Sequence, residues 1–252
     1  MPPEGNPFAK TNNGWWESLS LGWLEKVNLQ SDLETLQFAE KQQGHLQAEM
    51  TGIAVENEEI GRLLHVSGFG VITAVTVYAA IGDISRFEDA EHLVGYAGLG
   101  TRVHDSGLTM RTGKITKAGR RDLRVVLVEA AHVAANSHLH WKAELARLQP
   151  RLGYNKAIVA IARKLLVTVW HVLARKVADR FAEPEKVSKK MLHFAYEVGK
   201  ANRAGKSAAQ FTRERMDTLG MGQDLTSIPW GSKKPIPLPP SKLKKESAVP
   251  NK

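Results

Sequence analysis

The feature that most constrains how this chain can fold is a glycine-punctuated, basic stretch in its middle. From Thr101 to Thr116, polar residues and glycines interrupt any helical pattern. They predict two short strands, around Arg102-Val103 and Lys114-Ile115, joined as a small hairpin. Because helical patterns lie on both sides, we expect this hairpin to leave a helical domain and return to it, with Ser106 in its loop.

Amphipathic helices dominate the flanking sequence, so the expected fold class is mainly α. One helix is predicted from Gly119 to Asn136 and a long one from an N-cap at Asn155 to about Ala182, with a short helix between them that ends before Pro150. The apolar positions at helical spacing are Leu123, Leu127, Ala130, Ala131 and Ala134 in the first helix, and Ile158, Ile161, Leu165, Leu166, Val169 and Leu173 in the second.

Residues 29–60 carry a seven-residue apolar repeat, which predicts a coiled-coil-like helix. One register holds Leu29, Leu36, Gln43, Met50 and Asn57, and the other holds Asp32, Ala39, Leu46, Ile53 and Ile60. Residues 17–60 contain nine acids and two lysines, so this helix is not expected to lie on nucleic acid. Self-association and packing on its own domain both remain open.

Two apolar helical patterns between Leu63 and Ala74 are joined by Gly68-Phe69-Gly70. Glycines on both sides of a hydrophobic residue allow a tight turn, and the free backbone N–H groups of the second helix can hold a phosphate. This is the logic of a helix-hairpin-helix, which binds the DNA backbone without reading sequence. The alternative is plain turn chemistry.

The charge balance favours a polyanionic partner. The chain has 35 Lys and Arg against 26 Asp and Glu, a formal net charge of +9. Seven cations fall between residues 102 and 124, in a composition that suits a phosphodiester substrate. The candidate phosphate ligands are Arg102, Arg111, Lys114, Lys117, Arg120 and Arg124. Composition alone leaves Ser106 either a nucleophile or an ordinary turn serine.

The two ends differ in composition from the centre. Residues 1–28 are expected to form a poorly ordered lead-in, and residues 183–252 a flexible, basic, Pro-rich tail that either binds nucleic acid or is merely solvated. The chain has no cysteine, and its first ten residues do not resemble a signal peptide. Arg163 and Lys164 interrupt the longest apolar segment, so we expect a cytoplasmic protein without a membrane partner.

The order of short motifs resembles one known family. After the Gly-hydrophobe-Gly turn come Ile81-Gly82-Asp83, Tyr96-Ala97-Gly98-Leu99, Asp105-Ser106-Gly107, Gly113-Lys114-Ile115-Thr116-Lys117-Ala118-Gly119, Leu127-Val128-Glu129-Ala130-Ala131 and Ala160-Ile161-Ala162-Arg163-Lys164-Leu165-Leu166. This series, over roughly residues 60–180, closely resembles the carboxy-terminal transposase domain of the Piv-invertase-like insertion-sequence transposases, the insertion-sequence one-hundred-and-ten family. The domain is assigned to residues 61–182.

The resemblance implies a role for Ser106 as the nucleophile that joins covalently to DNA, and a structured bridge RNA as guide. It also implies an amino-terminal RuvC-like domain that holds Mg²⁺ on Asp and Glu side chains, followed by a coiled coil. Residues 1–28 hold only Glu4, Glu17 and Glu25 as acids and are too few for such a domain. We therefore expect a chain truncated at its start, with the Mg²⁺ bound by another polypeptide and no cofactor bound by this one.

Two functions follow as hypotheses. The first is a DNA transposase or site-specific recombinase fragment that cleaves and rejoins strands through Ser106, working with DNA, a guide RNA and either further copies of itself or a full-length transposase. The second is a catalytically inactive remnant that binds nucleic acid and oligomerises.

Overall fold

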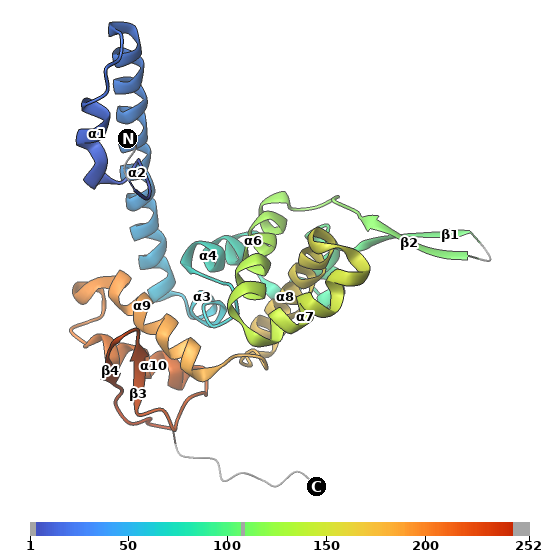
Figure 1. Cartoon of the computed structure of the whole chain (residues 1–252). Coiled ribbons are helices and arrows are strands. Elements are labelled where there is room, and N and C mark those ends of the chain that lie inside the picture. The colour runs from blue at the N-terminus through green and yellow to red at the C-terminus, as the bar shows by residue number, and fades with distance from the viewer. Residues whose placement is uncertain (1–3, 107–108, 244–252) are drawn as a thin grey trace. The chain divides into compact units, whose positions relative to one another are not determined.

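The computed structural model describes residues 4–106 and 109–243. The side chains of Lys10, of Asn13 and of residues 102–114 lie outside that description. The mainly α fold predicted from the sequence is confirmed (Figure 1). The helices are α1 (Asn13–Glu17), α2 (Trp23–Glu56), α3 (Glu58–Leu63), α4 (Val71–Ile81), α5 (Ala90–Tyr96), α6 (Arg121–Ser137), α7 (Leu139–Leu152), α8 (Tyr154–Arg175), α9 (Pro184–Asn202) and α10 (Ala208–Thr218). The strands are β1 (Thr101–Ser106), β2 (Thr109–Ile115), β3 (Ser227–Trp230) and β4 (Lys233–Pro237).

The chain divides into two compact units, Met1–Leu46 and Gln47–Lys252, and α2 contributes residues to both. In the first unit the expected disorder of residues 1–28 is wrong for its described part. Trp16 stacks on Phe8 and donates its indole N–H to the Pro7 carbonyl over 2.9 Å. Phe8 and Trp16 line a cavity together with Leu33 and Leu36 of α2. The tryptophan thus packs within its own unit, which gives this short segment a local apolar anchor.

The predicted coiled-coil-like helix is longer at its start and shorter at its end than residues 29–60. It begins at Trp23 and ends at Glu56, where Asn57 caps the next helix by accepting a hydrogen bond from the Ile60 amide over 3.0 Å. The asparagine side chain competes for backbone donors, which favours a helix start at that point. Leu46 and Ile53, two members of the apolar repeat, are more than half exposed on α2.

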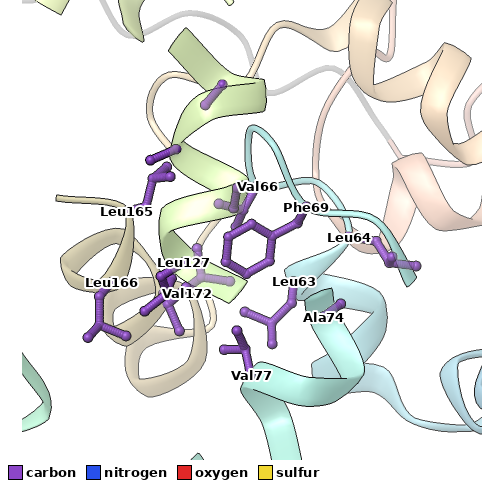
Figure 2. Close-up of a cluster of buried hydrophobic side chains, with 14 of the residues drawn as sticks. Leu63, Leu64, Val66, Phe69, Ala74, Val77, Leu127, Leu165, Leu166 and Val172 are labelled. Carbon is purple, nitrogen blue, oxygen red and sulfur yellow. The ribbon is translucent and has the colours of Figure 1, made fainter. Parts of the chain in front are cut away.

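The core of the second unit is built around α8. Nine of its residues are buried at helical spacing, so the helix presents a wide apolar face to its neighbours. Figure 2 shows Leu165, Leu166 and Val172 of this helix in one cluster with Leu127 of α6, and Phe69 lies in the same cluster. Among the described helices, α8 alone is long and apolar enough to cross a membrane, but half of its most apolar window is buried inside the fold. It is the central core helix of this unit.

The carboxyl ends of α7 and α8 differ from those predicted, and each helix ends where the next residue has a positive φ. α7 continues through Pro150 to Leu152 and ends at Gly153, whose φ of 76° breaks the helix. α8 ends at Arg175 and not near residue 182, because Lys176 adopts a left-handed conformation with φ of 54°. The residues from Lys176 to Glu183 therefore form a connection to α9.

The expectation of a disordered tail over residues 183–252 is wrong for the part up to Leu243. α9, α10 and the β3–β4 hairpin fold there, and Leu192, Ile228 and Leu238 form a small core of their own. Arg213 is 3% exposed and donates to the carbonyls of Pro239, Gly222 and Leu225. Prolines suit this segment because a two-stranded sheet has edges where no amide donor is needed. Residues 244–252 lie outside the described residues.

Buried polar groups link the segment between α3 and α4 to the connection before α9 and to α9 itself. The Nε2 atom of His65 accepts a hydrogen bond from the Asp179 amide over 2.7 Å, and the Lys190 ammonium donates to the Val66 carbonyl over 2.8 Å. His65 is 1% exposed, and this burial lowers its pKa to about 4. The imidazole is therefore neutral in the folded protein at pH values near 7.

This buried histidine predicts a loss of stability on acidification. Because its folded pKa lies below the ordinary value of 6.5, the unfolded chain binds more protons as the pH falls from 6.5 towards 4. His65 alone should cost about 1.5 kcal/mol of unfolding free energy between pH 6.5 and about pH 5. Asp179, whose pKa burial raises, acts in the opposite direction.

A His65→Gln variant isolates the effect, since its amide oxygen can still accept the Asp179 N–H. Urea unfolding measured at both pH values should show a flatter pH dependence in the variant by about that amount. Identical slopes in the two proteins would contradict a buried, neutral His65.

Candidate active site

The predicted hairpin around Ser106 is present. β1 and β2 pair antiparallel, with Ser106 opposite Thr109 and Thr101 opposite Ile115, and an irregularity lies between Thr101 and Val103. Ser106 is therefore the last residue of β1 before the turn, while Gly107 lies outside the described residues. The predicted ligands Arg102, Arg111 and Lys114 are placed on the two strands by their backbones alone.

The base of the hairpin is fixed by backbone contacts with the end of α5. The Thr116 amide donates to the Gly100 carbonyl over 2.9 Å, and the Lys117 amide donates to the Gly98 carbonyl over 3.1 Å. Gly119 passes so close to α5 that a Cβ atom there would lie 2.3 Å from the carbonyl oxygen of Tyr96. Only glycine fits at position 119, because the backbone there lies against the backbone of Tyr96. The two ends of the hairpin therefore lie side by side at the end of α5.

Two of the predicted phosphate ligands are engaged within this base. Arg124 donates to the carbonyl of Ala97, the C-cap residue that follows α5, over 2.9 Å. Arg120 binds the carboxylate of Asp122 through two nitrogens, and these hydrogen bonds hold the pKa of Asp122 well below its usual range. Lys117 is exposed and has no ion pair within the described part of the chain. The structure thus brings Lys117, Arg120 and Arg124 together below the strands.

The two glycines in the turn between α3 and α4 have different roles. Phe69 is buried in the core beside Leu63 and Leu127, as Figure 2 shows. Gly68 has φ of +81°, and a Cβ there would lie 2.1 Å from the Ala130 carbonyl oxygen of α6. Gly70 is exposed, caps α4 in an extended conformation and has open space around it. The first glycine therefore serves packing, while the second leaves the start of α4 without a side-chain cap.

Sequence reasoning missed the roles of Gly98, Gly119 and Arg124 in closing the hairpin. The signal available was the pair of glycines that flank the polar stretch at residues 98 and 119. Neither spacing nor composition shows that the guanidinium of Arg124 donates a hydrogen bond to the carbonyl of Ala97, which lies 27 positions earlier. That relation arises only when α5 and α6 pack together.

A divalent-cation site is not formed by the residues that the structure describes. Within residues 4–106 and 109–243, no group of three or more His, Asp or Glu side chains could hold a metal ion. His132 instead bonds the Tyr154 hydroxyl, and His138 bonds the Phe181 carbonyl. These two histidines thus make contacts that hold neighbouring segments together.

Comparison with known proteins assigns this helical region to a class. Residues 61–146 match the family model described as Transposase IS116/IS110/IS902 family. The matched segment runs from α3, through the Ser106 hairpin, to α7. Residues 61–146 are therefore similar to the transposase domain of the IS116/IS110/IS902 family, the family that the order of the motifs predicted.

Individual relatives agree with that assignment. The chain is 34% identical over 142 residues to the transposase for insertion sequence element IS1111A of Coxiella burnetii, an alignment that covers 54% of this chain and 39% of the relative. It is 32% identical over 120 residues to a pilin gene-inverting protein of Moraxella bovis, covering 46% and 37%. A probable family 20 transposase of Pseudomonas aeruginosa is 30% identical over 160 residues, covering 60% and 45%. The chain thus spans less than half the length of these relatives.

Proposed function

We propose that this chain supplies the serine nucleophile of a DNA transposase or site-specific recombinase. The observation that carries this proposal is the position of Ser106 as the last residue of β1, on a hairpin whose base is clamped between α5 and α6. Its membership in the matched transposase region supports the same conclusion. Two of the relatives are named as a transposase and as a gene-inverting protein, and both names describe the rearrangement of DNA.

The proposed chemistry is a transfer of a phosphoryl group to serine and back. The Ser106 Oγ atom forms a bond to phosphorus, and the bond from phosphorus to the leaving sugar oxygen breaks. The proton lost from the serine hydroxyl is balanced by the proton gained by the leaving hydroxyl. Attack by another strand's hydroxyl on the phosphoserine then rejoins DNA and restores Ser106.

The cations near the hairpin would stabilise the negative charge that develops on the phosphoryl oxygens. Lys117 and Arg120 lie at its base, and Arg102, Arg111 and Lys114 lie along its strands. Arg124 already holds the Ala97 carbonyl, so in this proposal its contribution is to position the base of the hairpin. The helix-hairpin-helix turn and the hairpin would together follow a DNA backbone, with Gly70 at the start of α4.

The remaining partners follow from the family resemblance and from α2. A RuvC-like domain of a full-length transposase would bring the Mg²⁺ ion, and a guide RNA would select the DNA. The exposed Leu46 and Ile53 of α2 favour pairing with another helix of the same kind. In this proposal such pairing brings the serine of one polypeptide to the metal site of another.

The nucleophile is tested with the protein mixed with a full-length relative and labelled donor DNA. A covalent protein–DNA adduct on this chain, which is resolved by its size on a denaturing gel, should fall about a thousandfold or more in Ser106→Ala. The matched control is Ser137→Ala, an exposed serine on α6 away from the hairpin, which should keep the adduct. An undiminished adduct in Ser106→Ala would sink the assignment.

A non-catalytic protein that binds nucleic acid and oligomerises is the second candidate, and the exposed apolar residues of α2 favour it. For this candidate, the affinity for DNA or RNA would be unchanged in Ser106→Ala and weaker when Arg120 and Arg124 are both replaced by alanine. No covalent adduct would form. Because Arg124 holds the Ala97 carbonyl, folding of that double variant is checked by circular dichroism. Equal affinity at low and high salt would count against both candidates.

A further inference from the structure

A second basic site lies away from the hairpin, in a cavity between the start of α7, the end of α8 and the connection to α9. The cavity has a volume of about 490 Å³ and is lined by His140, Lys164, His171, Arg175, Arg180 and Phe181, among others. This volume lies within the range of small-ligand sites in proteins. Nothing in the proposed serine chemistry uses these residues.

The wall of the cavity is largely apolar and includes buried side chains. Trp141 is 1% exposed, and Val172 is fully buried at the same lining. The ring of His140 stacks on Phe181 with centroids 3.6 Å apart, and the guanidinium of Arg180 lies over the Phe181 ring at 4.6 Å from its centroid. The guanidinium of Arg175 lies over the Trp170 ring at 5.6 Å. Stacking therefore orders both guanidinium groups at the rim before any ligand binds.

The cations of this rim exceed the carboxylates that face them. Lys164 forms an ion pair with Glu144, whose carboxylate also binds Arg147 over 2.8 Å. Arg175 and Arg180 have no ion pair within residues 4–106 and 109–243. Asp179 is the acid in the lining, and it is buried, with its carboxylate accepting the Phe181 amide over 3.0 Å. The excess charge at the rim is thus positive.

Burial and the positive charge at the rim lower the pKa of two histidines in the lining, His140 and His171. Burial lowers the pKa of His171, and the neighbouring Arg175 and Arg180 lower it further. Burial also lowers the pKa of His140, and the nearby His138, Lys164 and Arg180 add to this against the opposing carboxylate of Glu144. Both imidazoles are therefore kept neutral next to fixed cations, and an anion placed among those cations would favour their protonation.

We propose that this cavity binds a phosphate group of nucleic acid, with Arg175 and Arg180 as the charged donors and the His140–Phe181 stack as the adjoining apolar wall. The choice of nucleic acid over another phosphate-bearing ligand rests on the proposed function. Guanidinium groups suit phosphate because their planar donors can bind two oxygens at once. The site would hold a strand at a place separate from the Ser106 hairpin.

Binding is tested on the whole chain with a short, fluorescently labelled single-stranded DNA and, in a second arm, with inorganic phosphate. The double variant Arg175→Ala, Arg180→Ala should bind the DNA about tenfold more weakly at low salt, since two partly exposed contacts are lost. The dependence of log K on log salt should become shallower by about 1 to 2. Arg175→Lys with Arg180→Lys should recover part of the affinity.

The matched control is Arg151→Ala, which removes an exposed arginine of α7 outside the cavity lining. This variant should keep the DNA-induced change in the pKa of His140 and His171. In the unsubstituted protein, NMR titration should show that bound DNA raises the pKa of both His140 and His171. In the double variant the DNA-induced rise should be lost. Ser106→Ala should leave every one of these results unchanged, which separates this proposal from the proposed nucleophile.

Two outcomes would overturn the proposal. One is equal DNA affinity in the double variant and the unsubstituted protein. The other is that inorganic phosphate raises the pKa of His140 and His171 whereas DNA does not. That result would make the cavity a site for a small phosphorylated ligand.

Discussion

Replacing Gly68 by alanine is expected to lower the unfolding free energy of the second unit by about 3 kcal/mol or more. The new Cβ atom would lie 2.1 Å from the backbone oxygen of Ala130, and the backbone at position 68 has φ of +81°. Neither the α6 carbonyl nor the turn can move without disturbing the core around Phe69 and Leu127 (Figure 2). Urea unfolding monitored by circular dichroism measures the loss.

The same motif offers its own control. Gly70 has φ of −108°, and a Cβ atom added there would meet no other atom within 4 Å. Gly70→Ala should therefore change stability by no more than about 0.5 kcal/mol. Equal losses in the two variants would show that Gly68 is not packed against α6 as described. A large gap between them would assign the first glycine to packing and leave the second free for contact with a ligand.

Replacing Arg213 by methionine is expected to cost about 3 to 5 kcal/mol in the part of the chain from α9 to β4. Methionine has no donor, so the carbonyls of Pro239, Gly222 and Leu225 would be left buried and unpaired. The change should appear as faster hydrogen exchange of the Leu238 amide, which donates to the Thr226 carbonyl over 2.8 Å.

Lys234→Met is the matched control, because it removes an exposed cation from the neighbouring strand β4. Exchange at the Leu238 amide should be unchanged there. If Arg213→Met also left that amide protected, the three carbonyl contacts would contribute little, and the folding of this region would rest on Leu192, Ile228 and Leu238 alone.

The sequence predicted those elements whose stability comes from periodic apolar residues. α6 and α8 follow directly from Leu123, Leu127, Ile161 and Leu165, because side chains three and four positions apart share one helix face. The Ser106 hairpin was predicted for the opposite reason, since glycines and polar residues exclude a helix there. In both cases the local pattern and the packed fold agree.

The region after residue 183 was wrongly predicted to be a flexible tail, although part of it carries the same kind of apolar pattern: Val187, Met191, Phe194 and Val198 are buried at helical spacing in α9. The lysines and prolines of this region hide that pattern in its composition, and a further stabilising contact, the binding of three carbonyls by the buried side chain of Arg213, is polar. A polar contact of that kind leaves no periodic trace in the sequence. For the same reason the proposed phosphate site was missed, because His140 and Arg180 are far apart in sequence and meet only through the packing around Phe181.

The joined base of the β1–β2 hairpin also bears on how this domain can vary. Because the Lys117 amide already bonds the Gly98 carbonyl, the loop is closed at its root whatever lies beyond it. Residues added beyond that root need not alter it, and in a flexible segment each doubling of the loop length costs only about 0.6 kcal/mol of chain entropy. The reach of the arm that carries Ser106 can therefore change in evolution while Gly98, Gly119 and the helices beneath them stay as they are.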